Sequence, residues 1–554
     1  MKQIEYNLLE ERWMRVRGQD YTVQEVSLPD ALLHAHEYRD LAGELPTQDA
    51  AMLRLLLAVL HTVFSRVDEN GTPAPFEETD DALIRWEKLY RLGHFPEAPI
   101  RAYLEQWRDR FWLFHPERPF WQVPEAKIGT EYTASKLNGE LSESSNKLRL
   151  FSSYAGEGKE GLTYAQAARW LLSVNGYDDT SAKPKGKGLP SVGAGWLGKL
   201  GYIQAQGSNL FETLMLNLTL LKDGVELWGE NHPCWELEQP RSAERTEIAL
   251  PDTKIPCPDD PAQLLTLQSR RLLLNREGET VTGFTLLGGD FFARENAFAE
   301  QMTVWRDPDA KKSKKIGQVT FVPSRHDPAK QFWREFPAVF CEEGESVRRP
   351  GVVRWVEMLQ NDPDCPLERK RLIRFAISGM KYGDKDFFVN DSFSDSLTFQ
   401  AALLGELGRR WTVPIRDEIG RCEQAAQYVG RLAWELSLAA GDKNDTTAES
   451  ARTQFYFTID QPFRLWLQSI DPETDKLDEK ADEWQEEARK LAAELGRQMV
   501  ERAGNAAFVG HRVEVKTGGK KDEKKTNLYT APKAYNSFLY NLRKLYPKKE
   551  GGTA

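Results

Sequence analysis

Apolar residues recur at helical spacing after about residue 365, and this pattern most constrains the fold. Three stretches carry it: Tyr428, Val429, Leu432 and Leu436; Trp484, Ala488, Leu491, Leu495 and Met499; and Tyr535, Phe538, Leu539 and Leu542. Side chains three and four positions apart share one face of an α-helix, and an apolar face must be buried against another element. With a further segment at about 394–410, the pattern predicts four long amphipathic helices. A four-helix bundle is the economical way to bury all four faces.

Shorter strand and helix patterns fill the residues before this point. Alternating apolar residues within 1–30 predict two short strands joined by a turn. The apolar run over 46–66 predicts a central helix with Thr47 as its N-cap. A chain of 554 residues also exceeds one ordinary hydrophobic core. We therefore predict an α+β fold, with a mixed α/β N-terminal domain over 1–365 and a C-terminal four-helix bundle over 366–554.

Two stretches of the N-terminal domain are predicted to be loops with a function. Residues 131–161 are polar and serine-rich and keep no helical or strand period, which is typical of a long mobile loop. Residues 183–198 combine lysines, glycines and prolines. Glycine lets the backbone approach a ligand closely because no Cβ stands in the way, and a lysine beside it attracts phosphate.

The charge of the chain is acidic overall but uneven. The net charge of −10 disfavours a protein that coats nucleic acid by itself, since such proteins are usually basic. Residues 511–550 hold eleven lysines and arginines and four acidic residues, so they carry +7 and the rest of the chain carries −17. This basic C-terminal segment predicts either a phosphate-contacting surface or a solvated tail.

The composition is typical of a soluble globular protein, with 40% hydrophobic and 29% charged residues. No apolar run is long enough to span a bilayer, and the first residues lack the apolar core of a signal peptide. The expected location is therefore the cytoplasm, with no membrane partner. Five scattered cysteines without a CxxC pair predict no zinc site.

Catalytic motifs have little support in the sequence. Gly193 to Lys199 matches GxxxxGK, but Leu200 stands where a P-loop needs serine or threonine to hold Mg²⁺. His326 and Asp327 form a lone pair without the further histidine and aspartate ligands of a metal-dependent hydrolase. No catalytic residue, metal ligand or cofactor is therefore assigned, and the chain is predicted not to be an enzyme.

Six segments, in their order along nearly the whole chain, resemble the large subunit of type I-E Cascade, the CasA family of RNA-guided CRISPR surveillance complexes. They are YNLLEERWMRVRG, FWLFHPERPFWQVPE, LRLFSSYAGEG, KGKGLPSVGAGWLGKLG, GSNLFETLMLNLTLL and AISGMKYGDKDFFVND. The resemblance implies a non-catalytic subunit that recognises the protospacer-adjacent motif in double-stranded DNA, helps to open the duplex and recruits a helicase-nuclease. Its expected partners are the target DNA, the 5′ handle of the guide RNA, the helicase-nuclease and the other Cascade subunits.

The resemblance also implies roles for particular residues. The glycine loop that approaches the DNA matches three residues: Gly186, Lys187 and Gly188. The second choice for this loop is a nearby pair: Gly193 and Gly195. The aromatic residue that contacts the guide RNA matches Phe151. The lysine that contacts the motif falls within one basic cluster: Lys311, Lys312, Lys314 and Lys315.

The family's wedge is a short turn whose glutamine tip inserts beneath the first base pairs, and it is expected at Asp384, Lys385 and Asp386. Asp386 stands where the family has glutamine, and a carboxylate is repelled by the phosphates. Either Lys385 takes the role of the tip, or the motif preference differs, or the register is shifted by one. The zinc-type cysteine cluster found in some relatives is absent from the sequence.

Two other functions stay open from the residues alone. One is a metal-dependent nuclease or phosphohydrolase that uses His326 and Asp327. The other is a scaffold subunit of the same kind of assembly without direct DNA contact.

Overall fold

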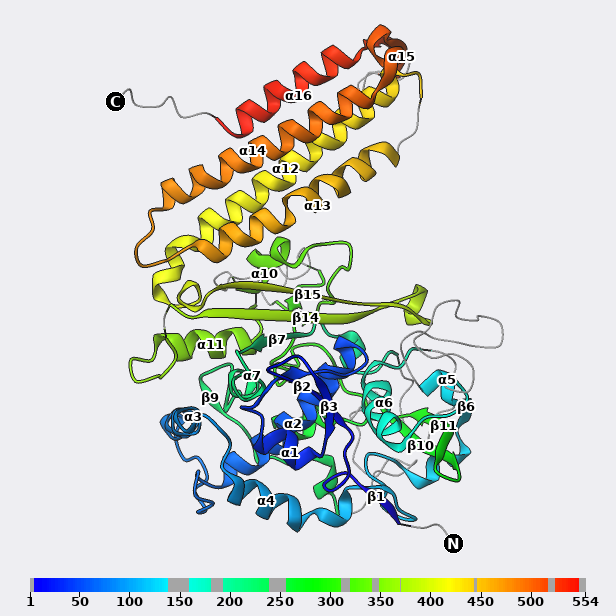
Figure 1. Cartoon of the computed structure of the whole chain (residues 1–554), viewed down its shortest axis with the longest axis vertical. Helices are drawn as coiled ribbons and strands as arrows, with labels where there is room; N and C mark the ends of the chain where they lie inside the picture. Colours follow the sequence, from blue (N-terminus) through cyan, green and yellow to red (C-terminus); the bar gives the residue numbers. More distant parts are fainter. Residues whose placement is uncertain are drawn as a thin grey trace. The chain divides into compact units, whose positions relative to one another are not determined.

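Short antiparallel sheets around a buried helix make up most of the N-terminal part of the chain, and long helices make up the C-terminal part (Figure 1). This computed structural model describes residues 4–137, 159–180, 193–238, 256–309, 319–340, 348–368, 370–442, 446–516 and 524–547. The predicted α+β fold with a helical C-terminal bundle is confirmed.

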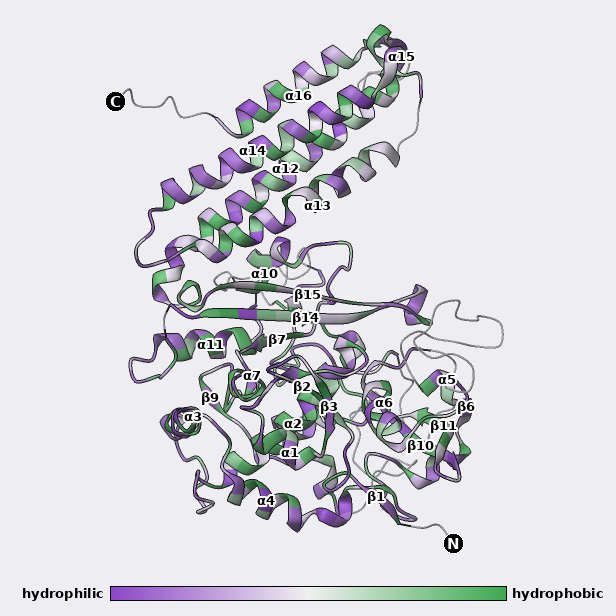
Figure 2. Cartoon of the chain, viewed as in Figure 1, coloured by the Kyte–Doolittle hydropathy of each residue, from purple (hydrophilic) through white to green (hydrophobic). Residues whose placement is uncertain are grey.

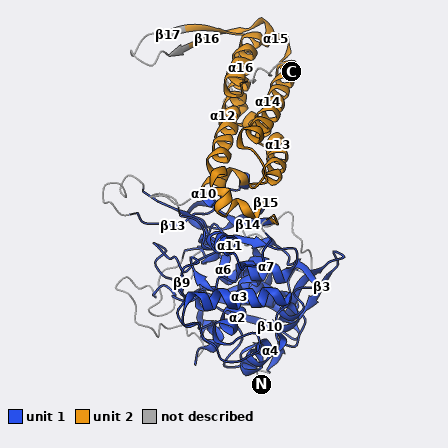
Figure 3. Ribbon diagram, turned by 90° about the vertical axis from the view of Figure 1, so that its left-hand side faces the viewer, with its two compact units in different colours: residues 1–332, 338–368, 373–397 blue, residues 333–337, 369–372, 398–554 orange. Residues whose placement is uncertain are grey.

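The chain divides into two compact units (Figure 3). Unit 1 contains residues 1–332, 338–368 and 373–397, and unit 2 contains residues 333–337, 369–372 and 398–554. The boundary at residues 365 and 366 stays a prediction, because the strands that follow it run through both units.

Helix α2 (Pro46–Arg66) is the centre of unit 1 and is buried along almost its whole length. It contacts four other helices: α4 (Glu97–Gln106), α6 (Tyr164–Tyr177), α7 (Leu210–Asn217) and α8 (Pro261–Leu265). The prediction that Thr47 caps α2 is wrong. The helix begins one residue earlier, at Pro46, whose fixed φ suits the first helical position, and Thr47 is buried inside the first turn.

Within the described residues, three sheets have three strands each. Their strand orders are β3 (Val23–Val26), β2 (Met14–Gly18), β4 (Tyr38–Leu41); β10 (Arg270–Glu277), β11 (Thr280–Gly288), β6 (Thr130–Thr133); and β15 (Val389–Gln400), β14 (Leu372–Tyr382), β7 (Ile203–Gln206). Strand β4 of the first of these sheets contacts α2. Two-stranded pairs are β1 (Glu5–Asn7) with β5 (Trp112–Phe114), β8 (Leu221–Lys222) with β9 (Glu226–Leu227), and β12 (Trp305–Arg306) with β13 (Val322–Pro323). The predicted pair of strands within 1–30 is confirmed by β2 and β3.

The remaining short helices of this part of the chain are α1 (Leu28–Leu33), α3 (Thr79–Leu92), α5 (Ala134–Leu137), α10 (Phe336–Phe340) and α11 (Gly351–Asn361). None of the helices within the described ranges is long and apolar enough to cross a membrane.

The start of the predicted loop 131–161 is regular structure. Residues 130–133 pair with β11 as strand β6, and the short helix α5 follows directly. Tyr132 stacks on Phe284 of β11 with ring centroids 5.3 Å apart. A four-residue edge strand is too short to show a period in the sequence, so its pairing partner decides its conformation. Residues 138–158 lie outside the described residues.

The predicted helix at about 394–410 is wrong. Residues 389–400 form strand β15, and short 3₁₀ turns follow before the first long helix begins at Arg409. Leu397 and Phe399 are both buried, which is the two-residue period of a strand. The fourth helix of the bundle lies instead at 446–469, where Pro462 in the helix interior masked an otherwise helical pattern.

The bundle of unit 2 consists of α12 (Arg409–Ala439), α13 (Thr446–Ser469), α14 (Leu477–Arg502) and α16 (Ala531–Leu545). Hydrophobic and hydrophilic residues alternate along these helices (Figure 2). Phe463 of α13 meets the Trp484 ring of α14 edge-on at 5.0 Å, and Trp484 is almost fully buried. Aromatic edge contacts of this kind add to the area that the bundle buries.

The basic C-terminal segment belongs partly to this bundle. Strand β16 (His511–Lys516) pairs with β17 (Lys524–Tyr529), the short helix α15 (Gly504–Val509) precedes them, and α16 follows. Phe538 and Leu542 of α16 are buried. These described residues thus form regular structure, while the choice between a phosphate-contacting surface and a solvated one stays a prediction.

Gly496 of α14 packs directly under a ring of α16, and this contact can be tested. A Cβ at Gly496 would lie 2.4 Å from Phe538 Cε1. We expect Gly496→Ala to lower the Tm of the bundle, because overpacking costs about 1–3 kcal/mol, which outweighs the gain of about 1 kcal/mol in helix propensity. Gly420→Ala in α12, where a Cβ meets nothing within 4 Å, is the matched control and should raise the Tm. An equal rise in both variants would contradict this packing.

Candidate nucleic-acid interface

The two ends of the stretch 181–192 are held together by Arg270 of β10. Its Nε donates to the Asp178 carboxylate at 2.6 Å, and its Nη2 donates to the carbonyl oxygens of Asp178, Asp179 and Gly193 at 3.1, 3.0 and 2.8 Å. The Gly195 N–H also donates to the Asp178 carbonyl at 2.9 Å. We call residues 178–180 and 193–201, on the two sides of the predicted glycine loop, the neck, and these bonds fix the spacing between its two sides.

Trp196, the large aromatic residue within this neck, is buried. Its indole Nε1 donates to Glu300 at 2.8 Å, and its ring packs on Phe292 with centroids 4.3 Å apart. Glu300 also pairs through both carboxylate oxygens with Arg54 of α2, and both side chains of this pair are almost fully buried. The neck is thus bonded to the central helix of unit 1.

Gly195 and Lys199 both pack against other residues of the protein. A Cβ at Gly195 would lie 2.3 Å from the carbonyl oxygen of Gly176, so this glycine allows close packing against the end of α6. Lys199 Nζ lies 3.4 Å from the centroid of the Phe291 ring and has no hydrogen-bond partner. The GxxxxGK spacing therefore falls in a packed segment, where a 3₁₀ turn and strand β7 follow in place of the helix of a P-loop.

Burial perturbs the titration of this lysine. Burial, together with the positive charges of Arg270, Arg294 and Arg325, lowers the pKa of the Lys199 amine to about 6. At neutral pH the folded chain therefore favours the uncharged amine at this position.

The predicted wedge lies at the turn between strands β14 and β15. Asp384–Asp386 form a 3₁₀ turn, and Lys385 and Asp386 have left-handed backbone angles with φ of 53° and 61°. Asp384 and Lys385 are exposed, and the Phe387 ring beside them is 42% exposed. The turn thus presents a cation and an aromatic ring to solvent.

Asp386 does not point freely from this turn, because Arg325 holds it. The two Nη atoms of Arg325 lie 2.5 and 3.0 Å from the two Asp386 carboxylate oxygens, and Arg325 Nε donates to the Gly198 carbonyl at 2.6 Å. The same guanidinium lies over the Tyr382 ring at 4.7 Å. The Asp386 carbonyl in turn accepts from the Thr180 N–H at 3.0 Å. The turn is therefore bonded to both ends of the neck.

The flanks of the other two predicted loops meet the same neck. Lys136, one residue before the end of the described part of the 131–161 stretch, donates to the Asp179 carboxylate at 2.9 Å. On the flanks of the basic cluster at 311–315, the Val304 N–H donates to the Gly201 carbonyl at 3.0 Å and the Ser324 N–H donates to the Val304 carbonyl at 2.8 Å. Four segments distant in sequence therefore converge.

Most of the predicted contact residues themselves lie outside the described residues. These are Gly186, Lys187, Gly188, Phe151, Lys311, Lys312, Lys314 and Lys315. The described ones are Gly193 and Gly195 in the neck and Asp384, Lys385 and Asp386 in the turn. Sequence reasoning missed Arg270 and Arg325, because an isolated arginine carries no local pattern that reveals its distant partners.

His326 is buried in the protein interior and bonds to the backbone there. The side chain is buried, and its Nε2 lies 3.1 Å from the Tyr202 carbonyl oxygen. A ring nitrogen that donates to a carbonyl is not free to bind a metal ion. Across the described ranges, no cluster of three or more histidine, cysteine, aspartate or glutamate residues has the arrangement of a metal site.

Comparison with known proteins identifies the family. The sequence model of the family described as CRISPR-associated protein Cse1 matches residues 7–495. The chain belongs to the Cse1 family. This confirms the predicted relation to the large subunit of type I-E Cascade, because a curated relative from Thermus thermophilus carries both names, CasA and Cse1. That relative is 33% identical over 342 residues, which cover 62% of this chain and 61% of the relative.

Solved structures of Cse1 proteins share the fold over the whole chain. The crystal structure of Thermobifida fusca Cse1 is 29% identical, with a TM-score of 0.81 over 98% of both chains. Cse1 from Acidimicrobium ferrooxidans is 24% identical, with a TM-score of 0.75 over 99% of this chain and 100% of that one. The second similarity shows the fold alone.

The buried amine of Lys199 predicts a pH dependence of stability. An unfolded lysine has a pKa of about 10.4, so between about pH 6 and pH 10 the unfolded chain binds a proton that the folded chain does not. Stability should therefore rise with pH across this window, and Lys199→Met should remove this rise and increase the Tm most at its lower end. Thermal unfolding at pH 6.5, 8 and 9.5 measures this, with the exposed Lys127→Met as control. Parallel curves for wild type and Lys199→Met would contradict the burial of the amine.

The Arg325 link predicts local loosening when the guanidinium is replaced. Lysine keeps the positive charge but cannot pair with both oxygens of Asp386 and also reach the Gly198 carbonyl. We expect Arg325→Lys to speed amide hydrogen exchange by about tenfold at 383–388 and 196–200 while the Tm changes little. Arg294→Lys, at a half-exposed arginine, is the matched control and should leave both segments unchanged. Unchanged exchange in Arg325→Lys would mean that Arg325 does not hold the turn.

Proposed function

We propose that this chain is the non-catalytic subunit of an RNA-guided CRISPR surveillance complex that recognises the protospacer-adjacent motif in double-stranded DNA. In this proposal it helps to open the duplex and recruits the helicase-nuclease. Its partners are the target DNA, the 5′ handle of the guide RNA, the helicase-nuclease and the other Cascade subunits, and it acts in the cytoplasm.

The convergence of the four segments is the observation that carries this proposal. The flanks of the glycine loop, the basic cluster and the guide-RNA loop meet at one neck, and the wedge turn is bonded to the same neck through Arg325 and Thr180. Residues that read one short DNA element must lie within a few base pairs of one another. The convergence of these flanks at the neck supports a site that recognises one short DNA element.

Each segment has a distinct proposed role. The backbone at Gly186 and Gly188 approaches the minor groove, where the absence of a Cβ permits close contact, and Lys187 attracts phosphate. One lysine of the cluster 311–315 contacts the motif. Phe151 contacts the 5′ handle of the guide RNA.

The geometry of the turn favours Lys385 as the tip of the wedge. Arg325 neutralises and holds the Asp386 carboxylate, whereas Lys385 is exposed at a left-handed position. A lysine at the tip is attracted to the phosphates, and the exposed Phe387 ring can stack against an unpaired base. Asp384 and Asp386 then shape the turn, so the departure from glutamine does not place an unpaired carboxylate against DNA.

The overall charge is consistent with binding as part of an assembly. A chain of net charge −10 with a basic C-terminal segment binds nucleic acid where local geometry directs it. In the proposed division of roles, unit 1 reads the motif, and the bundle of unit 2 with its basic strands holds displaced DNA.

Gly188→Asp in the reconstituted complex tests the motif-reading role. An aspartate there adds both a side chain and a negative charge against the DNA backbone, so we expect affinity for motif-bearing duplex to fall by about tenfold or more. Electrophoretic mobility shift with matched duplexes that carry or lack the motif measures the effect. Gly420→Asp is the control, because Gly420 is exposed, has no left-handed backbone angle and leaves a Cβ with nothing within 4 Å.

Two outcomes of this experiment would favour the alternatives. If motif-dependent binding stays unchanged, and if charge reversal at Lys311, Lys312, Lys524 and Lys525 also leaves the salt dependence unchanged, a scaffold without DNA contact is favoured. Metal-stimulated DNA cleavage by the purified chain that disappears in His326→Ala would favour the nuclease.

A further inference from the structure

A cavity of about 420 Å³ lies in unit 1 at the C-terminal end of helix α2. Its walls come from four places: the last turns of α2, the segment between α2 and α3 at Pro75 and Phe76, Leu220 before β8, and the segment from β9 to Asn231. This volume is within the range of cavities that hold small organic ligands. It contains none of the residues assigned to the DNA or to the guide RNA, so the inference below is independent of the proposed function.

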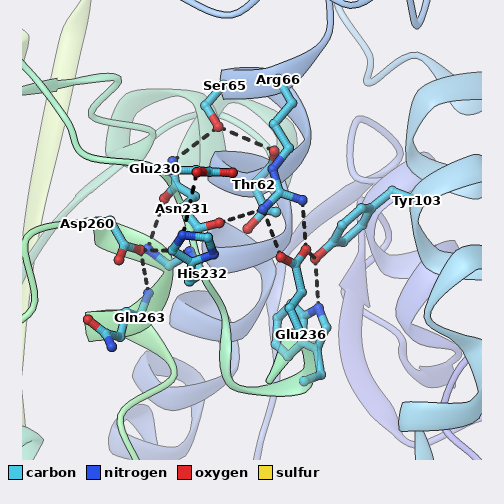
Figure 4. A network of polar contacts seen from close by, with 12 residues as sticks. Thr62, Ser65, Arg66, Tyr103, Glu230, Asn231, His232, Glu236, Asp260 and Gln263 are labelled. Carbon is cyan, nitrogen blue, oxygen red and sulfur yellow. Dashed lines mark hydrogen bonds and ion pairs between the residues drawn. The ribbon is translucent and has the colours of Figure 1, made fainter. Parts of the chain in front are cut away.

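A network of polar contacts fixes one wall of this cavity (Figure 4). Arg66 pairs with both carboxylate oxygens of Glu236, each at 2.8 Å, and Tyr103 donates to the same carboxylate at 2.7 Å. Asn231 Nδ2 donates to Ser65 Oγ at 3.1 Å, and its Oδ1 accepts from the Ala262 N–H at 3.1 Å. The segment that covers the cavity is therefore bonded to α2, α4 and α8.

Aromatic side chains form part of the remaining lining, and they are also held in place. Trp228 donates from its indole nitrogen to the Thr219 carbonyl at 2.7 Å. The guanidinium of Arg85 lies 5.3 Å from the Phe76 ring centroid and donates to the Phe64 and Ala74 carbonyls. The cavity is thus largely preformed and suited to a flat apolar ring.

His61 of α2 is the unexplained polar group of this cavity. The residue is 2% exposed and lines the cavity, and its ring nitrogens bond to no other described residue but are not among the side-chain atoms that the protein shields completely. Burial lowers the pKa of His61 to about 3, so the ring is neutral at physiological pH. A neutral imidazole has one donor and one acceptor, and neither is used by another described residue. A ligand that fills the cavity can therefore hydrogen-bond to this ring.

The charges around the cavity select against an anion. Arg66, the lining cation, is already neutralised by Glu236. Glu230 at the rim is exposed, and His232 Nε2 lies 3.7 Å from its carboxylate. A free carboxylate repels phosphate but accepts hydrogen bonds from sugar hydroxyls, as acidic residues do at ribose sites.

We propose that this cavity binds an uncharged nucleoside, or a heteroaromatic molecule of that size. The ring edge hydrogen-bonds to His61, the ring packs on the apolar lining that includes Phe76 and Trp228, and the sugar hydroxyls face Glu230. The acidic rim makes the nucleoside a better ligand than the corresponding nucleotide.

Isothermal titration of the full chain with adenosine, guanosine, cytidine and uridine tests this proposal, with AMP as the charged comparator. We expect saturable binding of at least one nucleoside. The monophosphate of that nucleoside, which is AMP for adenosine, should bind about tenfold more weakly than the nucleoside itself. His61→Phe should weaken nucleoside binding by about tenfold, because the ring edge loses its partner. Glu230→Gln should narrow the difference between nucleoside and nucleotide, whereas the exposed Glu279→Gln should not.

Several outcomes would overturn the proposal. These are no saturable binding of any of the four nucleosides up to about 10 mM, equal or tighter binding of the monophosphate in wild type, and unchanged binding in a folded His61→Phe variant. If His61→Phe does not fold, Glu230→Gln still tests the proposal, because Glu230 is exposed. If the ratio of nucleoside affinity to nucleotide affinity is the same in Glu230→Gln as in wild type, the acidic rim is not part of the binding site and the proposal is wrong.

Discussion

A buried guanidinium, that of Arg270, holds the part of unit 1 from which the predicted nucleic-acid segments emerge. It pairs with Asp178 and satisfies three backbone carbonyl oxygens on both sides of the stretch 181–192. Removing one partner of such a buried pair leaves an uncompensated charge and costs about 3–5 kcal/mol. The residues on the two sides of the predicted glycine loop are therefore held at a fixed spacing.

Other arginines of unit 1 also bond segments that are distant in sequence. Arg54 binds Glu300, which also receives the Trp196 indole, and Arg325 joins the neck to the hairpin turn. Arg169 of α6 binds Glu44 and the Trp13 carbonyl. Planar guanidinium groups suit this task because they offer several donors in a fixed geometry. A rigid frame of this kind keeps the flanks of the predicted recognition loops in place.

Regular patterns in the sequence predicted much of the fold, and short or interrupted ones did not. The bundle helices at 428–436, 484–499 and 535–542 follow from a helical period that extends over several turns. The sequence did not predict the helix at 446–469, because Pro462 interrupts its helical sequence pattern, and it predicted a helix where β15 lies. In both cases neighbouring elements decide the outcome: Leu397 and Phe399 are buried in β15, and Phe463 packs on Trp484.

By itself the sequence determined the family, the α+β class and the segments that carry the predicted contacts, since these depend on residue types and their order. Only the tertiary structure decided that the flanks of these segments converge, that Arg270 and Arg325 hold them, and that Asp386 is engaged while Lys385 is exposed. It also decided that the buried His61 lines a cavity. The physical reason is that a hydrogen bond between residues a hundred or more positions apart leaves no local period in the chain, so it exists only once packing brings the two groups together.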